Sequence, residues 1–278
     1  MRFEKWHGIG NDFIMFADPD DHLSLDPATV KALCDRRFGI GADGVIRVAP
    51  GTDGAELFMD YVNSDGSLGE MCGNGIRCLA VFAREQGLTT SDQIKVGTRS
   101  GLKVLWIEGD QVRVDMGPPD FRAEKIPVRT ENPLHVEISL GTDVFQATCL
   151  ATGNPHAVIF VDEPDRVPLA NVGPAIERHK LFPNRTNAEF VVVESPDRIR
   201  MRVWERGSGE TLACGTGACA AAVAARVIKG TNERVIVALP GGELEVEWAG
   251  SIDKEASIFL SGPVAKSFEG DVDLASFA

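Results

Sequence analysis

An internal repeat with a constant offset constrains this chain more than any other sequence feature. The segment 72–84 resembles the segment 214–226, and seven of the thirteen aligned positions are identical, including the leading Cys72 and Cys214. The same offset of 142 residues (214 − 72) continues without a gap to the matched pair Trp106 and Trp248. Because this offset is close to half of the 278 residues, the pattern is typical of a duplicated domain. The chain is therefore expected to fold as two related halves.

The two halves share one predicted order of elements. Alternating apolar and polar residues predict strands over 56–62 and 198–204, directly before the repeated cysteines. Alanine-rich helices are predicted after the cysteines, over 75–85 and 217–228. Further strands are predicted over 102–107, 111–115, 235–239 and 243–248, and an earlier helix from an Asp26 cap to Gly39. We expect an α/β fold of the α+β roll type, in which each half curls a mixed sheet around one central helix.

Two glycine–proline sites mark the predicted domain boundaries. Gly117 is followed by two prolines, and Gly262 is followed by one. We therefore expect a first half over 1–117, with residues 265–278 returning to it, and a second half over 118–264.

The charge balance limits the classes of partner. Lys and Arg number 28 against 41 Asp and Glu, which gives a net charge of −13. An acidic surface repels phosphate backbones and anionic lipids, so neither nucleic acid nor membrane is expected as a partner. No apolar run is long enough to span a bilayer, and the first residues do not have the pattern of a signal or transit peptide. The expectation is a cytoplasmic protein that binds a small molecule.

The six cysteines are expected to be thiols, because disulfides are rare in the cytosol. They form no C-x-x-C pair and the five histidines are scattered, so no metal site is predicted. Four of the six are expected to be buried apolar residues. These are Cys34, Cys149, Cys78 and Cys219, of which the last two point away from the motif cysteines on a helix turning about 100° per residue.

The remaining two, Cys72 and Cys214, lie at strand-to-helix junctions and are followed by Gly-x-Gly. Glycines there let the backbone bend and expose N–H groups, which form an anion site with the helix N-terminus. A cysteine in this place is expected to have a pKa lowered from about 8.5 toward neutrality. Two such thiols around one carboxylate suit racemisation at an amino-acid α-carbon: a thiolate removes the proton from one face and a thiol returns one to the other. The helix ends would stabilise the enediolate-like transition state.

These motifs resemble those of the diaminopimelate epimerase family. The likeness is carried by residues 63–67, 71–78 and 205–217, with similar signatures over 5–13 and 153–156, and it covers essentially the whole chain. The resemblance implies a cofactor-free isomerase, independent of pyridoxal phosphate, that interconverts LL- and meso-diaminopimelate on the route to lysine and peptidoglycan. It also implies two pseudo-symmetric α/β domains with the site in the cleft between them, and usually a homodimer.

The resemblance further implies roles for individual residues. Cys72 and Cys214 would be the base and acid pair, and His156 and Glu205 would tune their pKa values. Some members of the family carry a substrate-contacting Gln where this chain has Gly44, so no such contact is predicted. The reacting carboxylate would be held by Gly73, Asn74, Gly215 and Thr216, and the other ends of the substrate by Asn11, Asn63, Asn154, Asn187, Glu205 and Arg206.

Three other functions stay open at this point. A proline racemase or hydroxyproline epimerase also uses two thiols as proton carriers. Those relatives usually carry His where Asn74 stands, and they lack the residues that would hold a second, distal carboxylate. A duplicated anion-binding module would not need a cysteine at both helix heads. A dithiol oxidoreductase is conceivable because two close thiols can oxidise. Turnover tests with diaminopimelate and proline separate these functions.

Overall fold

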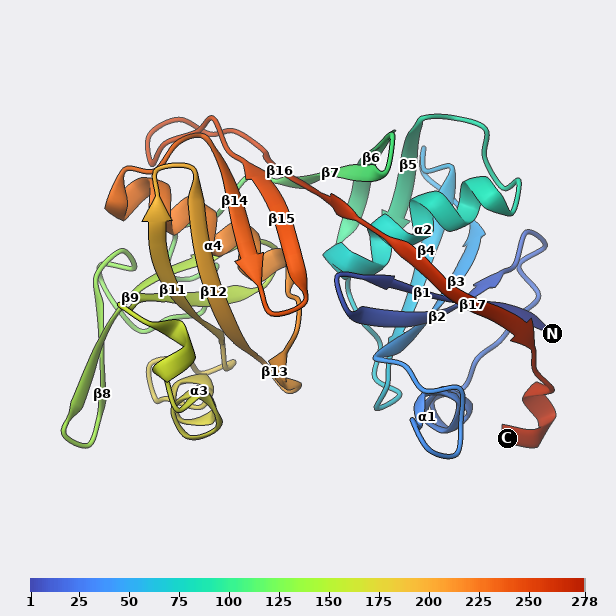
Figure 1. Cartoon of the computed structure of the whole chain (residues 1–278), viewed down its shortest axis with the longest axis horizontal. Helices are drawn as coiled ribbons and strands as arrows, with labels where there is room; N and C mark the ends of the chain where they lie inside the picture. The colour runs from blue at the N-terminus through green and yellow to red at the C-terminus, as the bar shows by residue number, and fades with distance from the viewer. Residues whose placement is uncertain (278) are drawn as a thin grey trace. The chain divides into compact units, whose positions relative to one another are not determined.

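The computed structural model of the chain describes residues 1–277, and the fold divides into two compact units (Figure 1). Unit 1 comprises Met1–Asp115 and Ser261–Ala278, and unit 2 comprises Met116–Leu260. The chain leaves unit 1 within strand β7 (Gln111–Gly117) and returns to it within β16 (Ile258–Pro263). The two boundary glycines of the sequence pattern, Gly117 and Gly262, therefore lie inside strands.

Unit 1 is a mixed sheet with the strand order β17–β1–β2–β3–β4–β5–β6–β7. The pairs β2–β3 and β4–β5 are parallel, and the other neighbours are antiparallel. Besides β7, its elements are β1 (Arg2–Gly8), β2 (Asn11–Ala17), α1 (Pro27–Cys34), β3 (Gly44–Pro50), β4 (Leu57–Asn63), α2 (Gly73–Glu85), β5 (Gln93–Thr98), β6 (Gly101–Glu108), β17 (Ala265–Asp271) and the 3₁₀ turn η2 (Leu274–Phe277).

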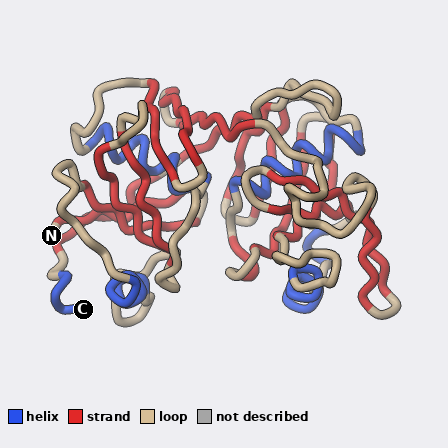
Figure 2. The backbone as a smooth tube through the Cα atoms, turned by 180° about the vertical axis from the view of Figure 1, so that it is seen from behind, coloured by secondary structure: helices blue, strands red, loops and turns tan. Residues whose placement is uncertain are grey.

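The sheet of unit 1 curls around α2 (Figures 1 and 2). The helix contacts β1, β2 and β3 and also β6, which is far from them in the strand order. Gly75 lets the head of the helix press onto the sheet, because a Cβ there would lie 2.7 Å from Ile46 Cδ1 and 3.0 Å from Met59 Cε. The strands therefore enclose the helix that carries Cys72 at its N-terminus.

Unit 2 has the same architecture, with the strand order β8–β9–β10–β11–β12–β14–β15 and with β13 paired to the end of β12. The pairs β10–β11 and β12–β14 are parallel, and α4 contacts the strands from β9 to β12 as well as β14 and β15. Its elements are β8 (Val136–Leu140), β9 (Asp143–Ala151), β10 (Pro155–Phe160), η1 (Pro164–Arg166), α3 (Leu169–Glu177), β11 (Asn187–Ser195), β12 (Arg198–Glu205), β13 (Gly209–Thr211), α4 (Gly215–Lys229), β14 (Arg234–Leu239) and β15 (Gly242–Glu247).

The duplication predicted from the repeat is confirmed by this topology. The first parallel pair of each unit has the same register, since Phe13 pairs with Gly44 and His156 with Asn187, each 31 residues apart (44 − 13 and 187 − 156). The cysteine-headed helices begin at Gly73 and Gly215, which the offset of 142 relates (215 − 73). The predicted α+β roll, with one central helix per half, is the observed fold.

One predicted helix is shorter than expected. Asp26 caps α1 as predicted, accepting from the N–H groups of the first turn, but the helix ends at Cys34 and not at Gly39. The Asp35 side chain accepts from the backbone N–H groups of Arg37 and Phe38 and so turns the chain away from the helix. Gly39 then folds back, where a Cβ would lie 2.2 Å from the Ala32 carbonyl oxygen. Because glycine has no Cβ, the chain at Gly39 can approach the end of α1 this closely.

Within residues 1–277, no helix combines the length and the apolar character that crossing a membrane requires.

Candidate functional site

Cys72 is the N-cap residue of α2, with an extended backbone (φ −133°, ψ 119°) and a half-buried side chain. Its Sγ lies 3.5 Å from Asn11 Oδ1. Gly73 and Asn74 follow in the first helical turn, where N–H groups lie beyond the reach of the helix's own carbonyl groups. Unit 1 therefore places a thiol beside a turn of backbone donors suited to an anion.

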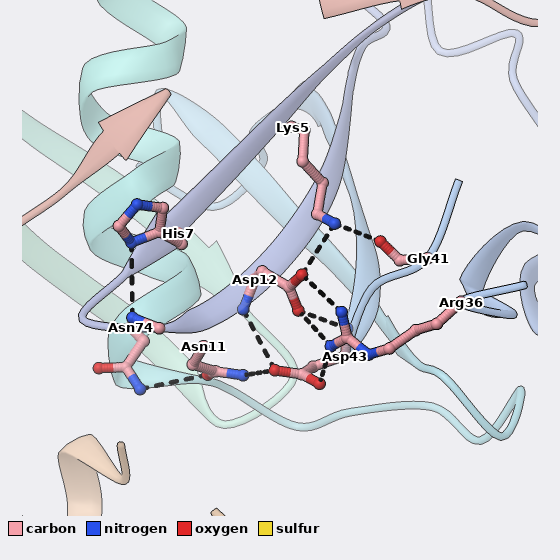
Figure 3. A network of polar contacts seen from close by, with 9 residues as sticks. Lys5, His7, Asn11, Asp12, Arg36, Gly41, Asp43 and Asn74 are labelled. Carbon is pink, nitrogen blue, oxygen red and sulfur yellow. Dashed lines mark hydrogen bonds and ion pairs between the residues drawn. The ribbon is translucent and has the colours of Figure 1, made fainter. Parts of the chain in front are cut away.

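The amide of Asn11 has a defined orientation (Figure 3). The residue follows a tight turn in which Gly10 has a φ of +90°. Its Nδ2 donates to Asp43 Oδ2 at 2.7 Å, so its Oδ1 faces the other way and accepts from Asn74 Nδ2 at 3.2 Å. Asn11 thus presents an oxygen to the neighbourhood of Cys72.

A charged network lies behind Asn11 (Figure 3). Arg36 donates to Asp12 at 2.7 and 3.0 Å and to Asp43 at 2.7 Å, and Lys5 lies 2.8 Å from Asp12. Burial acts to raise the pKa of Asp12, but hydrogen bonds from Arg36 and Lys5 outweigh it and lower the pKa to about 2. Asp12 therefore stays ionised at neutral pH, and Arg36 links it to Asp43, the carboxylate that orients Asn11.

Asn74 is held from inside the unit by Arg77, which is fully buried. The guanidinium donates to Asn74 Oδ1 and to the Gly73 carbonyl oxygen, both at 2.9 Å. Because its oxygen accepts from Arg77, the Asn74 amide turns its NH2 group toward Asn11 and acts there as a donor. This suits the predicted contact with a carboxylate.

Asn63 ends β4 and pairs with Gly44 of β3. Its amide donates to Ser67 Oγ at 3.0 Å and orders the loop that leads to Cys72. A Cβ at Gly44 would lie 2.6 Å from Tyr61 Cε2. The aromatic ring therefore occupies the space that a larger side chain at position 44 would need.

Cys214 is the N-cap residue of α4 and only 4% exposed. Its Sγ accepts from Gly217 N at 3.4 Å and lies 3.6 Å from Thr216 Oγ1, in the turn that also holds Gly215. Burial raises the pKa of the Cys214 thiol well above its usual range, and the carboxyl group of Glu205 raises it further. The expectation of a lowered thiol pKa is wrong for Cys214, because desolvation and the acidic neighbour Glu205 outweigh the helix N-terminus.

His156 is fully buried on β10, and both of its ring nitrogens are engaged. Nδ1 lies 2.6 Å from Glu189 Oε1, and Nε2 lies 2.8 Å from Asn154 Oδ1. Asn154 follows Gly153, which has a φ of +90°, as Gly10 has before Asn11. The structure therefore connects His156 with Asn154, another predicted substrate contact.

Asn187 and Arg206 meet at the end of β12. The buried Asn187 amide donates to the Pro155 carbonyl oxygen at 2.7 Å and accepts from Arg206 N at 2.8 Å. The Arg206 side chain is exposed and lies 3.4 Å from the Asn184 carbonyl oxygen. Glu205 accepts from Thr211 Oγ1 at 2.5 Å. Asn187 thus shapes the loop that presents the guanidinium.

Two residues next to the site were not singled out from the sequence, Glu189 and Asp43. A signal for Glu189 was present, because it is a charged residue inside the apolar run 188–193 of β11. Asp43 lies in a glycine-flanked turn and carries no comparable signal.

The other four cysteines are buried, as predicted: Cys34, Cys78, Cys149 and Cys219. Burial raises the pKa of Cys34 to about 12, with the charge of Asp12 adding to the rise. Among the described residues 1–277, no three His, Cys, Asp or Glu side chains are grouped as metal ligands.

The family model described as diaminopimelate epimerase matches residues 3–122 and 148–266 of this chain. The diaminopimelate epimerase of Moorella thermoacetica is 45% identical over 99% of this chain and 100% of that protein. That of Synechococcus elongatus is 43% identical, and the alignment covers 99% of each chain.

Solved structures of lower identity share the fold. A hydroxyproline epimerase from Agrobacterium vitis aligns with a TM-score of 0.68 at 14% identity, covering 97% of this chain and 91% of that one. A phenazine biosynthesis protein from Bacillus anthracis aligns with a TM-score of 0.66 at 16% identity, covering 98% of this chain and 99% of that one. At these identities the likeness concerns the fold alone.

Proposed function

The chain belongs to the diaminopimelate epimerase family, and from this premise we propose that it interconverts LL- and meso-diaminopimelate with Cys72 and Cys214 as its two proton carriers. The observation that carries the mechanism is the repeated geometry of the thiols. Each caps a helix whose first turn is built from glycine and a small polar residue. A thiol and an anion-binding turn are thus joined twice in one chain.

In the proposed reaction, the two cysteines and the helix heads carry every step. One cysteine, as thiolate, removes the α-proton, and the electron pair of the C–H bond moves into the carboxylate as an enediolate. Backbone N–H groups of the helix heads stabilise the added negative charge. The other cysteine, as thiol, protonates the opposite face, and the electron pair returns to the α-carbon.

We assign the resting thiol to Cys214. In the free protein its raised pKa keeps it protonated at neutral pH, so it is the proton donor in the direction of turnover that starts from this state. Cys72 is then the base in that direction. In the reverse direction the two residues exchange roles.

Recognition of the far end of the substrate rests on charge. Arg206 presents an exposed guanidinium, which pairs with a carboxylate through two hydrogen bonds. Glu205 next to it supplies an acceptor for an ammonium group. Asn63, Asn154 and Asn187 complete the predicted contacts in this proposal.

One experiment tests the proposed function. The protein is incubated in heavy water with LL-diaminopimelate, with L-proline or with buffer alone, and the products are separated by chirality and mass. We expect meso-diaminopimelate with one deuterium at the inverted carbon and unchanged proline. Racemised proline, or no exchange in diaminopimelate, would contradict the proposal.

The same family premise carries two further proposals, a cytoplasmic location and a homodimer. Light scattering coupled to size-exclusion chromatography tests the second, with an expected mass twice that of the 29.9 kDa chain.

A further inference from the structure

Glu189 is a buried acid inside an apolar strand, and it lies against the cysteine-headed helix of unit 2. It is fully buried, and a Cβ at Gly217, in the first turn of α4, would lie only 3.0 Å from its Oε1. The same Oε1 lies 2.6 Å from His156 Nδ1. Its Oε2 has no hydrogen-bond partner among residues 1–277. Burying a carboxyl group with an unpaired oxygen costs free energy, so its presence here calls for an explanation.

The surroundings of Glu189 favour the neutral acid. The titratable groups that face it are His156 on β10, Glu205 at the end of β12, Cys149 on β9 and Cys214 before α4. Burial raises the pKa of Glu189, and Glu205 adds to the rise while His156 opposes it. Burying an uncharged carboxyl group with one unpaired oxygen costs less free energy than burying a carboxylate with one unpaired oxygen.

The neutral acid dictates the tautomer of His156. When Glu189 donates its proton to Nδ1, that nitrogen is an acceptor and the ring proton resides on Nε2. Nε2 then donates to Asn154 Oδ1 at 2.8 Å. Because its oxygen accepts from the His156 ring, Asn154 directs its amide NH2 group away from His156.

We propose, on the basis of the function above, that Glu189 is a positioning residue: as a neutral acid it fixes His156 as the Nε2–H tautomer and thereby locks Asn154 as a donor for a substrate carboxylate. The amide in the corresponding place of unit 1 is locked in the opposite sense. Asn11 donates to Asp43 and so presents its oxygen. One amide is thus an acceptor and the other a donor, as a substrate with ammonium and carboxylate groups requires.

The tautomer can be measured without reference to activity. The wild-type protein is labelled with ¹⁵N-histidine, and long-range ¹H–¹⁵N correlation distinguishes the protonated ring nitrogen of each histidine. The signals of His156 are identified by their loss in His156→Gln. We expect Nε2 protonated and Nδ1 unprotonated at neutral pH. An Nδ1–H tautomer, or an imidazolium with both nitrogens protonated, would overturn the proposal.

Two variants separate hydrogen bonding from charge. Glu189→Gln can still donate to Nδ1, so we expect the same tautomer, kcat/KM within about threefold of wild type and an unchanged pH profile. Glu189→Leu cannot donate, so we expect the Nε2–H signature to be lost and KM for diaminopimelate to rise about 10- to 100-fold, with kcat affected much less. If Glu189→Gln is as impaired as Glu189→Leu, the neutral-acid role is wrong.

A matched control is available in the same unit. Thr231 is also buried, and its Oγ1 also has no hydrogen-bond partner within residues 1–277. Thr231→Val should change neither the His156 tautomer nor KM, and a change in either would show that the effects are merely structural. Should the wild type lack epimerase activity, the proposed function fails while the tautomer measurement still decides the role of Glu189 toward His156.

Discussion

At the scale of single residues, burial and nearby charge decide what the site groups can do. Cys214 shows this most clearly, because its position at a helix head favours a thiolate while its surroundings favour the thiol. Asn11 and Asn154 have the same side chain and opposite orientations, set by Asp43 and His156. The neighbours of a residue therefore determine its chemical role.

The first prediction concerns the two thiols. Cys72→Ala and Cys214→Ala should each abolish epimerisation, because one face of the α-carbon then lacks its proton carrier. Cys→Ser at either site should lose most of the activity, since an alkoxide is far harder to form than a thiolate. Chiral chromatography of the products measures the effect. Cys219→Ala, on α4 but buried in the core, is the control and should remain active.

The second prediction concerns the guanidinium of Arg206. Arg206→Met should lower kcat/KM for LL-diaminopimelate by about two to three powers of ten, because the distal carboxylate loses its charged partner. The variant should keep its fold, as seen by circular dichroism, and Cys72 should still react with a small alkylating reagent. Racemisation of lysine by the wild type, at a rate comparable with diaminopimelate, would contradict this role.

The third prediction concerns pH and Asp12. Its pKa is lowered to about 2, so its ion pairs stabilise the fold above the unfolded-state pKa of 3.8 and are lost as the pH falls toward 2. Asp12→Asn should therefore lower the free energy of unfolding by about 1–2 kcal/mol at pH 7, allowing for partial solvent screening. In urea titrations the deficit should shrink below about pH 4. A constant deficit down to pH 2 would argue against the ion pairs, and Asp110→Asn, in the exposed turn after β6, is the control.

At the scale of elements, close packing of helices on the sheets sets which residues are tolerated. In α3, Gly173 lies against the ring of Trp204, where a Cβ would come within 2.5 Å of the ring carbons. The ring is held in place, since its Nε1 donates to Glu177 Oε2 at 2.8 Å. Helix α3 can approach β12 this closely only with glycine at this position.

The fourth prediction follows from that contact. Gly173→Ala should destabilise unit 2 by about 1–3 kcal/mol, although alanine favours a helix by about 1 kcal/mol over glycine. Thermal unfolding measures the change. Ala170→Gly, at an exposed position of the same helix, reports the propensity effect alone. A stabilised Gly173→Ala variant would mean that the Trp204 ring moves aside freely.

At the scale of the whole molecule, the C-terminal segment completes the sheet of unit 1. Strand β17 pairs with β1 from Arg2 to His7, although the two strands are at opposite ends of the sequence. Lys266 reinforces the pairing through ion pairs with Glu4 at 3.3 Å and Glu85 at 2.9 Å. In unit 2 the corresponding edge is covered by β8, the neighbour of β9 in sequence.

The fifth prediction concerns this returning strand. A chain that ends at Val264 lacks β17 and leaves β1 as an open edge, so unit 1 should lose stability selectively. Hydrogen exchange followed by mass spectrometry should show faster exchange in β1 and β2 and unchanged exchange in β9 and β10. Uniform loss of protection across both units would contradict the assignment of β17 to unit 1 alone.

The sequence by itself determined the duplicated fold and the two cysteine-headed helices at its centre. Repeats, alternation and glycine-flanked cysteines are properties of chain order, so Cys72, Cys214 and the helices behind them could be read directly. The early end of α1 could not, because it depends on Gly39 folding back onto the helix.

Only the tertiary structure decided the protonation and orientation of the site groups. The thiol state of Cys214 depends on its burial and on Glu205, which reaches it from the end of β12. The donor role of Asn154 depends on a proton shared between His156 and Glu189, which parallel pairing of β10 and β11 brings together. Desolvation and electrostatic interaction act through space, so no local sequence pattern encodes them.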